Sequence, residues 1–259
     1  MNYNPVEGAA GNGSSKVGLI ASLTLGVLCF ALLVANLAVT VHVKGQLPAE
    51  QVTVTPLDMD SPPLMNLKGL KDKVEQYYYG ADGELWQADL DKAQMDWEAH
   101  FEGMTFTDKD VAVFDVDETL LNNLPEIKQS GWGYCRPDWD RWIQQANQTV
   151  LEQVRSGLYM LHDKGASVLL LTGRNENQRD ATVNNLRDVG IPPDMYLDLI
   201  LRQPDEHDDS AVKYKSTHRA EWAAKGYNFI ACFGDQYSDC EGPYVGHKIK
   251  LPNYAYYVA

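Results

Sequence analysis

Apolar and polar positions follow two different periods along residues 64–259. Four short, largely apolar runs predict buried strands at 111–114, 167–171, 197–201 and 228–233, and 247–251 is interpreted as an edge strand. Apolar side chains that recur every three or four positions predict helices at 64–80, 84–103, 149–164, 176–188 and 214–225. Strands separated by helices at this spacing indicate an α/β fold, with a Rossmann-like open, mainly parallel sheet and helices on both faces.

The first 63 residues differ from the rest of the chain. Residues 1–16 are polar and rich in Gly, Asn and Ser, and residues 17–41 contain no charged side chain. An uncharged run of about 25 residues, at ~1.5 Å per residue, reaches ~37 Å, which exceeds the ~30 Å hydrocarbon core of a bilayer. We therefore expect a disordered N-terminus at 1–16, a transmembrane signal anchor at 17–43, a linker at 44–63 and one folded domain at 64–259.

A cleaved signal peptide is the alternative interpretation of the apolar segment. The apolar stretch of such a peptide usually runs only ~7–15 residues, which is shorter than the uncharged run here. Lys16 and Lys44 flank the run on its two sides, so the basic residues do not fix its orientation in a membrane.

Composition narrows the classes of function. The chain carries 36 acidic and 22 basic residues and a net charge of −14, which argues against sequence-independent nucleic-acid binding. Its four cysteines are too few for a disulfide scaffold and form no C-x-x-C pair for structural zinc. If the domain is extracytoplasmic, we expect one disulfide among Cys135, Cys232 and Cys240. Cys135–Cys240 is one candidate, but sequence alone does not establish the pairing.

Conspicuous polar groups follow three of the predicted strands. Asp115 and Asp117 follow the first strand, residues 172–174 (Thr-Gly-Arg) follow the second, and Asp235 and Asp239 follow the fourth. The carboxyl ends of parallel strands open into one crevice, where this type of fold binds its ligands. We therefore expect these side chains to meet at one edge of the sheet.

Crowded carboxylates favour a bound cation. They repel one another and raise each other's proton affinity unless a divalent ion lies among them. An oxygen-only ligand set suits Mg²⁺, which also accepts a substrate phosphate. With the metal screening the phosphate, Asp115 can attack phosphorus as a nucleophile, while Thr172 and the amide of Gly173 suit phosphate oxygens. A lysine would complete the charge balance, and Lys213 and Lys215 are both candidates.

These motifs resemble those of the haloacid dehalogenase superfamily of phosphohydrolases. Within it, the sequence is similar to the plant-type acid phosphatases and vegetative storage proteins, and more distantly to the bacterial class B and C acid phosphatases. The resemblance covers about residues 65–259. The matching segments are 113–119 (VFDVDET), 123–125 (NLP), 171–174 (LTGR), 214–216 (YKS), 234–239 (GDQYSD) and 250–257 (KLPNYAYY).

The resemblance implies a phosphoric monoester hydrolase, an acid phosphatase that works through an aspartyl-phosphate. It implies Asp115 as the nucleophile and Asp117 as the general acid/base. Lys215, rather than Lys213, is implied as the residue that stabilises the charge of the nucleophile and of the phosphoryl group. An acid optimum follows because Asp115 must be ionised while Asp117 is protonated, and lower pH increases the fraction in that state.

The resemblance also implies the groups that bind metal and phosphate. Mg²⁺ is the implied cofactor, and Asp117 would contribute its backbone carbonyl. The implied metal-binding residues are Asp115, Asp117, Asp235 and, in support, Asp239. The implied phosphate-binding residues are Thr172, Gly173 and Lys215. Arg174 has two open interpretations, a phosphate contact or an ion pair with an acidic neighbour.

The connection at 122–147 is too long for an ordinary loop, and we expect a small cap there. It carries Trp132, Tyr134, Trp139 and Trp142. These aromatics either form a wall on the leaving-group side of the pocket or pack the cap onto the sheet, and the sequence leaves both interpretations open. An apolar wall would accept many phosphomonoesters, which predicts loose specificity.

The sequence thus predicts a membrane-anchored, Mg²⁺-dependent acid phosphatase that hydrolyses small phosphomonoesters and binds no nucleic acid; a homodimer is left open. We expect its domain in an extracytoplasmic space, lumenal, vacuolar or at the cell surface, or secreted if the apolar segment is cleaved. The alternative is a non-catalytic storage or interaction protein that retains the fold. The intact Asp115 favours the enzyme, because some storage proteins of this group lack the nucleophile.

Overall fold

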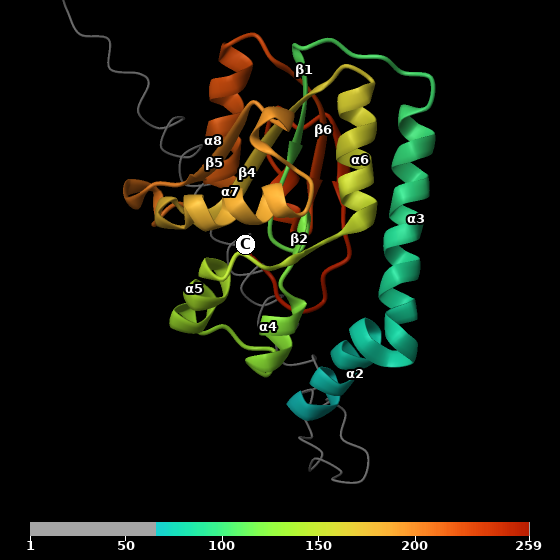
Figure 1. Cartoon of the computed structure of the whole chain (residues 1–259), viewed down its shortest axis with the longest axis vertical. Helices are drawn as coiled ribbons and strands as arrows, with labels where there is room; N and C mark the ends of the chain where they lie inside the picture. The colour runs from blue at the N-terminus through green and yellow to red at the C-terminus, as the bar shows by residue number, and fades with distance from the viewer. Residues whose placement is uncertain (1–65, 259) are drawn as a thin grey trace, which may run out of the picture. The chain divides into compact units, whose positions relative to one another are not determined.

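The computed structural model describes residues 66–258 (Figure 1). The expected disordered N-terminus at 1–16, the anchor at 17–43 and the linker at 44–63 lie outside the described residues and stay predictions. Within 66–258, no helix combines the length and the apolar character that crossing a bilayer requires.

A five-stranded sheet forms the centre of the domain, and all its strand pairs are parallel. The strand order is β5-β4-β1-β6-β7. The strands are β1 (Asp110–Phe114), β4 (Ser167–Asn175), β5 (Asp198–Arg202), β6 (Asn228–Gly234) and β7 (His247–Lys250). The predicted parallel sheet is confirmed, including its edge strand, because runs that are apolar on both sides can only be buried between two layers of helices.

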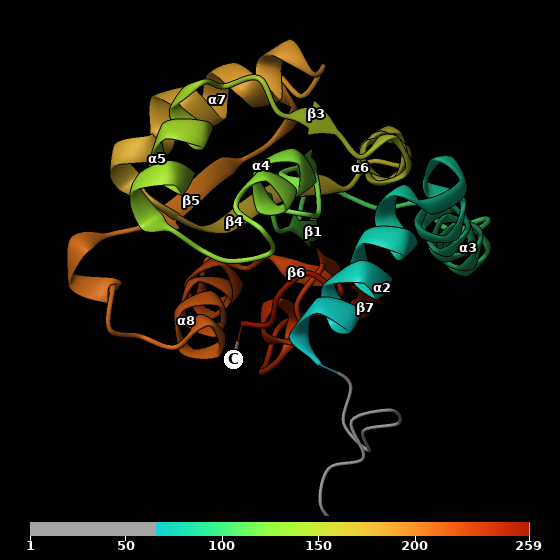
Figure 2. The same ribbon diagram turned by 90° about the horizontal axis from the view of Figure 1, so that it is seen from below.

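Helices cover both faces of this sheet (Figure 2). On one face lie α3 (Glu84–Phe101), α6 (Glu152–Asp163) and α7 (Arg179–Asp188), and on the other lies α8 (Ala211–Ala224). Strand β1 shows the division, since Ala112 and Phe114 belong to the first core and Val111 and Val113 to the second. This alternation is the period of two that a strand imposes on its side chains.

The segment predicted as a cap contains two short helices, α4 (Leu124–Gln129) and α5 (Arg136–Gln144), which lie below the sheet in Figure 1. Two short strands, β2 (Leu121–Asn122) and β3 (Thr149–Val150), pair antiparallel at its base. Helix α6 consequently starts at Glu152 rather than at the predicted 149. A further helix, α2 (Leu67–Tyr79), precedes α3 across the 3₁₀ turn Gly80–Gly83.

An aromatic stack holds together the two strand ends that matter most for the site. Phe114 ends β1 and Phe233 lies near the end of β6, and their rings stack with centroids 4.3 Å apart. Trp97 of α3 meets Phe233 edge-on at 5.3 Å, and all three side chains are buried. Because Asp115 and Asp235 follow closely on these two aromatics, core packing sets where the two carboxylates emerge.

Two glycines with positive φ angles, Gly165 before β4 and Gly226 before β6, differ in how closely the chain packs around them. Gly165 (φ +97°) and Gly226 (φ +88°) share the left-handed backbone, but a Cβ at 165 would lie 2.5 Å from the carbonyl oxygen of Phe106, while one at 226 would meet no atom within 4 Å. Gly226→Ala should lower the free energy of unfolding by about 1–2 kcal/mol. Gly165→Ala should cost at least about 1 kcal/mol more. Urea titrations measure both, and equal losses would contradict the close contact.

Candidate active site

Three buried aspartates converge at the carboxyl edge of the sheet. Strands β1 and β6 pair with Phe114 opposite Phe233, and the amide of Asp115 donates to the carbonyl of Phe233 at 2.9 Å. Asp115 and Asp235 therefore leave neighbouring strands at the same level. Carboxylate oxygens of Asp115, Asp235 and Asp239 all lie within 4.8 Å of one another. The expectation that these distant segments meet is confirmed.

Lys215 places its ammonium group between two of these carboxylates. Its Nζ donates to Oδ1 of Asp115 and, at 2.6 Å, to Oδ1 of Asp239. Ser210 caps α8 by accepting from the amide of Lys213, and this start places Lys215 on the buried side of the helix. Lys213 is exposed and pairs with Asp209 at 2.5 Å. Of the two candidate lysines, Lys215 is therefore the one in contact with Asp115.

Burial makes this cluster electrostatically costly. It raises the pKa of Asp115 well above its usual value; Lys215 opposes this shift, and Asp239 and Asp235 add to it. Burial, with smaller contributions from Asp239 and Glu118, raises the pKa of Asp235 to about 8. Burial, together with Asp117, likewise raises the pKa of Glu118 to about 8. The ionised form of each of these carboxyl groups is thus disfavoured, mainly because the group is buried.

The donor set fits a hard divalent cation. Three carboxylates offer oxygen atoms close together, and oxygen is the donor that Mg²⁺ and similar ions prefer. Burial raises the pKa values of Asp115 and Asp235, and a cation bound among them would oppose that rise. The carboxylate of Asp117 is not part of this group of three. The predicted contact of Asp117 with the metal is through its backbone carbonyl.

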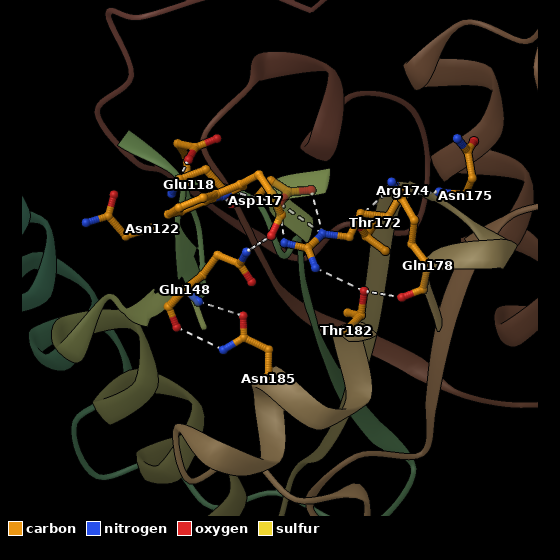
Figure 3. Close-up of polar contacts among 12 residues, drawn as sticks. Asp117, Glu118, Asn122, Gln148, Thr172, Arg174, Asn175, Gln178, Thr182 and Asn185 are labelled. Carbon is orange, nitrogen blue, oxygen red and sulfur yellow. Dashed lines mark hydrogen bonds and ion pairs between the residues drawn. The ribbon is translucent and has the colours of Figure 1, made fainter. Parts of the chain in front are cut away.

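Asp117 instead forms an ion pair with Arg174 (Figure 3). Nε and Nη2 of Arg174 donate to Oδ1 of Asp117 at 3.0 and 2.7 Å, and Nη1 donates to the hydroxyl of Thr182 at 3.0 Å. The side chain of Arg174 is 0% exposed. Of its two interpretations, the acidic neighbour is the contact observed.

The segment 172–174 lies where β4 loses its regular pairing with β5, between Leu171 and Asn175. Gly173 lines the cavity at the site, in open space. Thr172 is fully buried, and its hydroxyl accepts from the amide of Arg174 at 3.1 Å. Of the two residues predicted to contact phosphate from this segment, only Gly173 faces the cavity.

The cavity has a volume of about 490 Å³ and one polar and one aromatic side. Asp115, Lys215 and their neighbours line the polar side. The cap supplies Trp132, Tyr134 and Trp139. Trp142, the fourth predicted wall residue, does not line the cavity, because its indole Nε1 turns inward and donates to Asn123 at 2.9 Å. Of the two open interpretations, three of the aromatics form a wall of the cavity, whereas Trp142 packs within the cap.

The C-terminal segment 253–258 also contributes to the site. Asn253 Nδ2 donates to Oδ2 of Asp235 at 2.6 Å, and the hydroxyl of Tyr256 donates to Glu118. Residues 255–258 line the cavity. No sequence pattern predicts a role for Glu118, Asn253 or Tyr256, although Asn253 and Tyr256 belong to the matching motif 250–257.

The disulfide joins Cys232 and Cys240. The candidate pair Cys135–Cys240 was wrong, because Cys135 lies exposed in the cap as a free thiol. Cys232 lies in β6 and Cys240 follows Asp239, in a 3₁₀ turn (Tyr237–Cys240) that folds back on the strand. Both Asp235 and Asp239 therefore lie between the two bridged cysteines.

The sequence model of the HAD superfamily, subfamily IIIB (Acid phosphatase), matches residues 46–259, and the chain belongs to this family. Acid phosphatase 1 of Solanum lycopersicum is 36% identical over 154 residues, which are 58% of this chain and 60% of that protein. Vegetative storage protein 2 of Arabidopsis thaliana is 29% identical over 211 residues, 78% of this chain and 75% of that protein.

Solved structures of a class C acid phosphatase share the fold of this chain. A class C acid phosphatase from Bacillus anthracis, crystallised with tungstate bound, superposes with a TM-score of 0.56 at 26% identity. The match covers 72% of this chain and 85% of that one. Among the curated relatives, by contrast, the alignments to the tomato protein and to the Stem 28 kDa glycoprotein of Glycine max span about three fifths of each relative's length.

The raised pKa of Asp235 predicts how the free energy of unfolding depends on pH when metal is removed. Below about pH 4 both the folded and the unfolded chain are protonated at this residue, and above about pH 8 both are ionised. Between these limits the folded state holds the extra proton, so this residue makes folding less favourable as pH rises. Asp235→Asn cannot ionise, and its stability relative to the unaltered chain should therefore increase between pH 5 and pH 8.

Urea titrations in EDTA at the two pH values measure this difference. We expect the increase to be at least about 1.4 kcal/mol, the equivalent of one pKa unit. The exposed Asp163, changed to Asn, is the control and should show no comparable increase. A difference between Asp235→Asn and the unaltered chain that is constant with pH would contradict the electrostatic account.

Proposed function

We propose that this chain is a Mg²⁺-dependent acid phosphatase that hydrolyses small phosphomonoesters through an aspartyl-phosphate on Asp115. The observation that carries the proposal is the contact between the buried Asp115 carboxylate and the ammonium of Lys215, at a cavity large enough for a small phosphate ester. Family membership and the similarity to Acid phosphatase 1 support it.

In the proposed first half-reaction, an oxygen of Asp115 attacks phosphorus and the ester P–O bond breaks. Lys215 opposes the rise in the pKa of Asp115 that burial causes, and it stabilises the negative charge on the phosphoryl oxygens. The exposed backbone at Gly173 is available to these oxygens. Asp117 gives its proton to the leaving alkoxide. When bound by Asp115, Asp235 and Asp239, the divalent ion would supply positive charge that reduces the repulsion between carboxylate and phosphate.

In the second half-reaction, water attacks the phosphorus of the aspartyl-phosphate and Asp117 takes up the proton of that water. Inorganic phosphate leaves, and Asp115 returns to a carboxylate. The reaction therefore needs Asp115 ionised while Asp117 is protonated at its start. This requirement supports an optimum on the acid side.

An extracytoplasmic location is part of the proposal. The Cys232–Cys240 disulfide supports it, because disulfides persist mainly in oxidising compartments. Three of the relatives are named stem glycoproteins, which fits a secretory route for the family. The anchor at 17–43 would make the protein a single-pass membrane protein, and cleavage after that segment would make it secreted.

A storage protein that retains the fold is the second candidate, because two of the relatives are named vegetative storage proteins. Hydrolysis of p-nitrophenyl phosphate by the full chain at mildly acidic pH with Mg²⁺ separates the two functions. We expect turnover, its loss in EDTA and its recovery with added Mg²⁺. Asp115→Asn should reduce turnover by about 10³-fold or more, because an amide is a poor nucleophile. A folded chain without metal-dependent turnover on a broad panel of phosphate esters would contradict the enzyme.

The two lysines of α8 provide a matched pair. Lys215→Met should lower kcat by about 10²-fold or more, because it removes the cation beside Asp115. Lys213→Met removes an exposed lysine two positions away and should leave kcat and KM within about twofold. Steady-state kinetics with p-nitrophenyl phosphate measure both variants. Equal effects of the two substitutions would contradict the assigned role of Lys215.

A further inference from the structure

Asn123 is a fully buried side chain between the cap and Asp117. Its Oδ1 accepts from the indole Nε1 of Trp142 at 2.9 Å, and its Nδ2 donates to Oδ1 of Asp117 at 2.9 Å. Trp142 belongs to helix α5 of the cap, while Asn123 lies between β2 and α4. Two hydrogen bonds thus link the cap to the proposed general acid.

The tryptophan fixes which way the amide points. An indole N–H can only donate, so the oxygen of the Asn123 amide must face Trp142. The NH₂ group then has to face Asp117. Asn123 can therefore act only as a donor to Asp117.

This donor adds to those of Arg174 and makes the two oxygens of Asp117 unequal. Oδ1 receives Nδ2 of Asn123 at 2.9 Å together with Nε and Nη2 of Arg174 at 3.0 and 2.7 Å. Among residues 66–258, the one donor to Oδ2 is Nε of Arg174, which it shares with Oδ1 and which lies 3.1 Å away. A carboxylate oxygen has room for about two donors, so Oδ1 is fully occupied and Oδ2 is the oxygen open to a proton.

We propose that Asn123, oriented by Trp142, is a positioning residue that leaves Oδ2 of Asp117 to carry the proton given to the leaving group. As the ester P–O bond breaks, that proton passes from Oδ2 to the departing oxygen. Asp117 lines the cavity, as does Trp139, which belongs to the same helix, α5, as Trp142. The inference rests on the proposed function, in which Asp117 is the general acid.

The basicity of the leaving group provides the test. An alkyl phosphate releases a strongly basic alkoxide that needs the proton, whereas 2,4-dinitrophenyl phosphate releases a weakly basic phenolate that does not. Asn123→Leu should lower kcat/KM for ethyl phosphate by about 10–100-fold and for 2,4-dinitrophenyl phosphate by less than about threefold. Asp117→Asn should show the same selectivity at larger amplitude. The ratio of the two substrates is independent of the fraction of folded protein.

Controls separate positioning from a general structural effect. Asn185 is also buried, and its amide bonds the backbone of Gln148 rather than a residue of the site (Figure 3). Asn185→Leu should therefore leave the substrate ratio unchanged. Trp142→Phe removes the indole donor and should lower the rate on ethyl phosphate selectively, by about 3–10-fold. Trp222→Phe, on α8, should not change the ratio.

Each outcome has a distinct meaning. If Asn123→Leu does not fold, Trp142→Phe carries the test. Losses that are equal for both esters, or no loss for either, overturn the inference while the proposed function stands. If the unaltered chain hydrolyses neither ester in the presence of Mg²⁺, the proposed function fails and the inference fails with it.

Discussion

Negative charge buried at one edge of the sheet is the constraint on which the rest of the structure depends. Asp115, Asp235 and Asp239 are all buried with oxygens within 4.8 Å of one another. Carboxylates this close cannot all ionise unless positive charge lies among them. Lys215 supplies part of it from α8, and Arg174 balances the neighbouring Asp117 from β4. Helix α8 and strand β4 thus each contribute a cation to the same edge.

Much of this arrangement could be predicted from the sequence, because the parallel sheet translates chain order into spatial position. Apolar runs such as 111–114 and 228–233 identify buried strands, and the residues that follow them must emerge at one edge. This reasoning brings Asp115 and Asp235 together without any knowledge of their contacts. The choice between Lys213 and Lys215 needed the family resemblance. In the structure, the choice follows from the start of α8 at the Ser210 cap.

Other contacts depend on packing that no local pattern encodes. Tyr256 reaches Glu118 across 138 positions of the chain, and Trp142 turns away from the cavity to bond Asn123. The disulfide pairing was missed because it requires the chain to fold back in a 3₁₀ turn directly after β6. In each case the partner is selected by a tertiary approach, whereas periodicity reports only on neighbours within one helix or strand.

The cap is tied to the core through polar groups as well as through apolar packing. Gln178 Nε2, near the start of α7, donates to Asp140 of α5 at 2.9 Å, and Gln148 Nε2 donates to the backbone carbonyl of Trp142 at 2.8 Å. Directional contacts of this kind restrict rotation of the cap more than apolar contacts do. The aromatic side of the cavity and the residues around Asp117 are therefore held as one body.

The disulfide between Cys232 and Cys240 closes a small covalent ring that contains both Asp235 and Asp239. Once the ring is closed, these two carboxylates cannot move far apart, even if the turn loses its hydrogen bonds. The conformational entropy of bringing two ligands together is then lost when the bond forms, before any ion arrives. Oxidation of this pair during maturation would thus prepare a ligand site whose later occupation requires little further ordering.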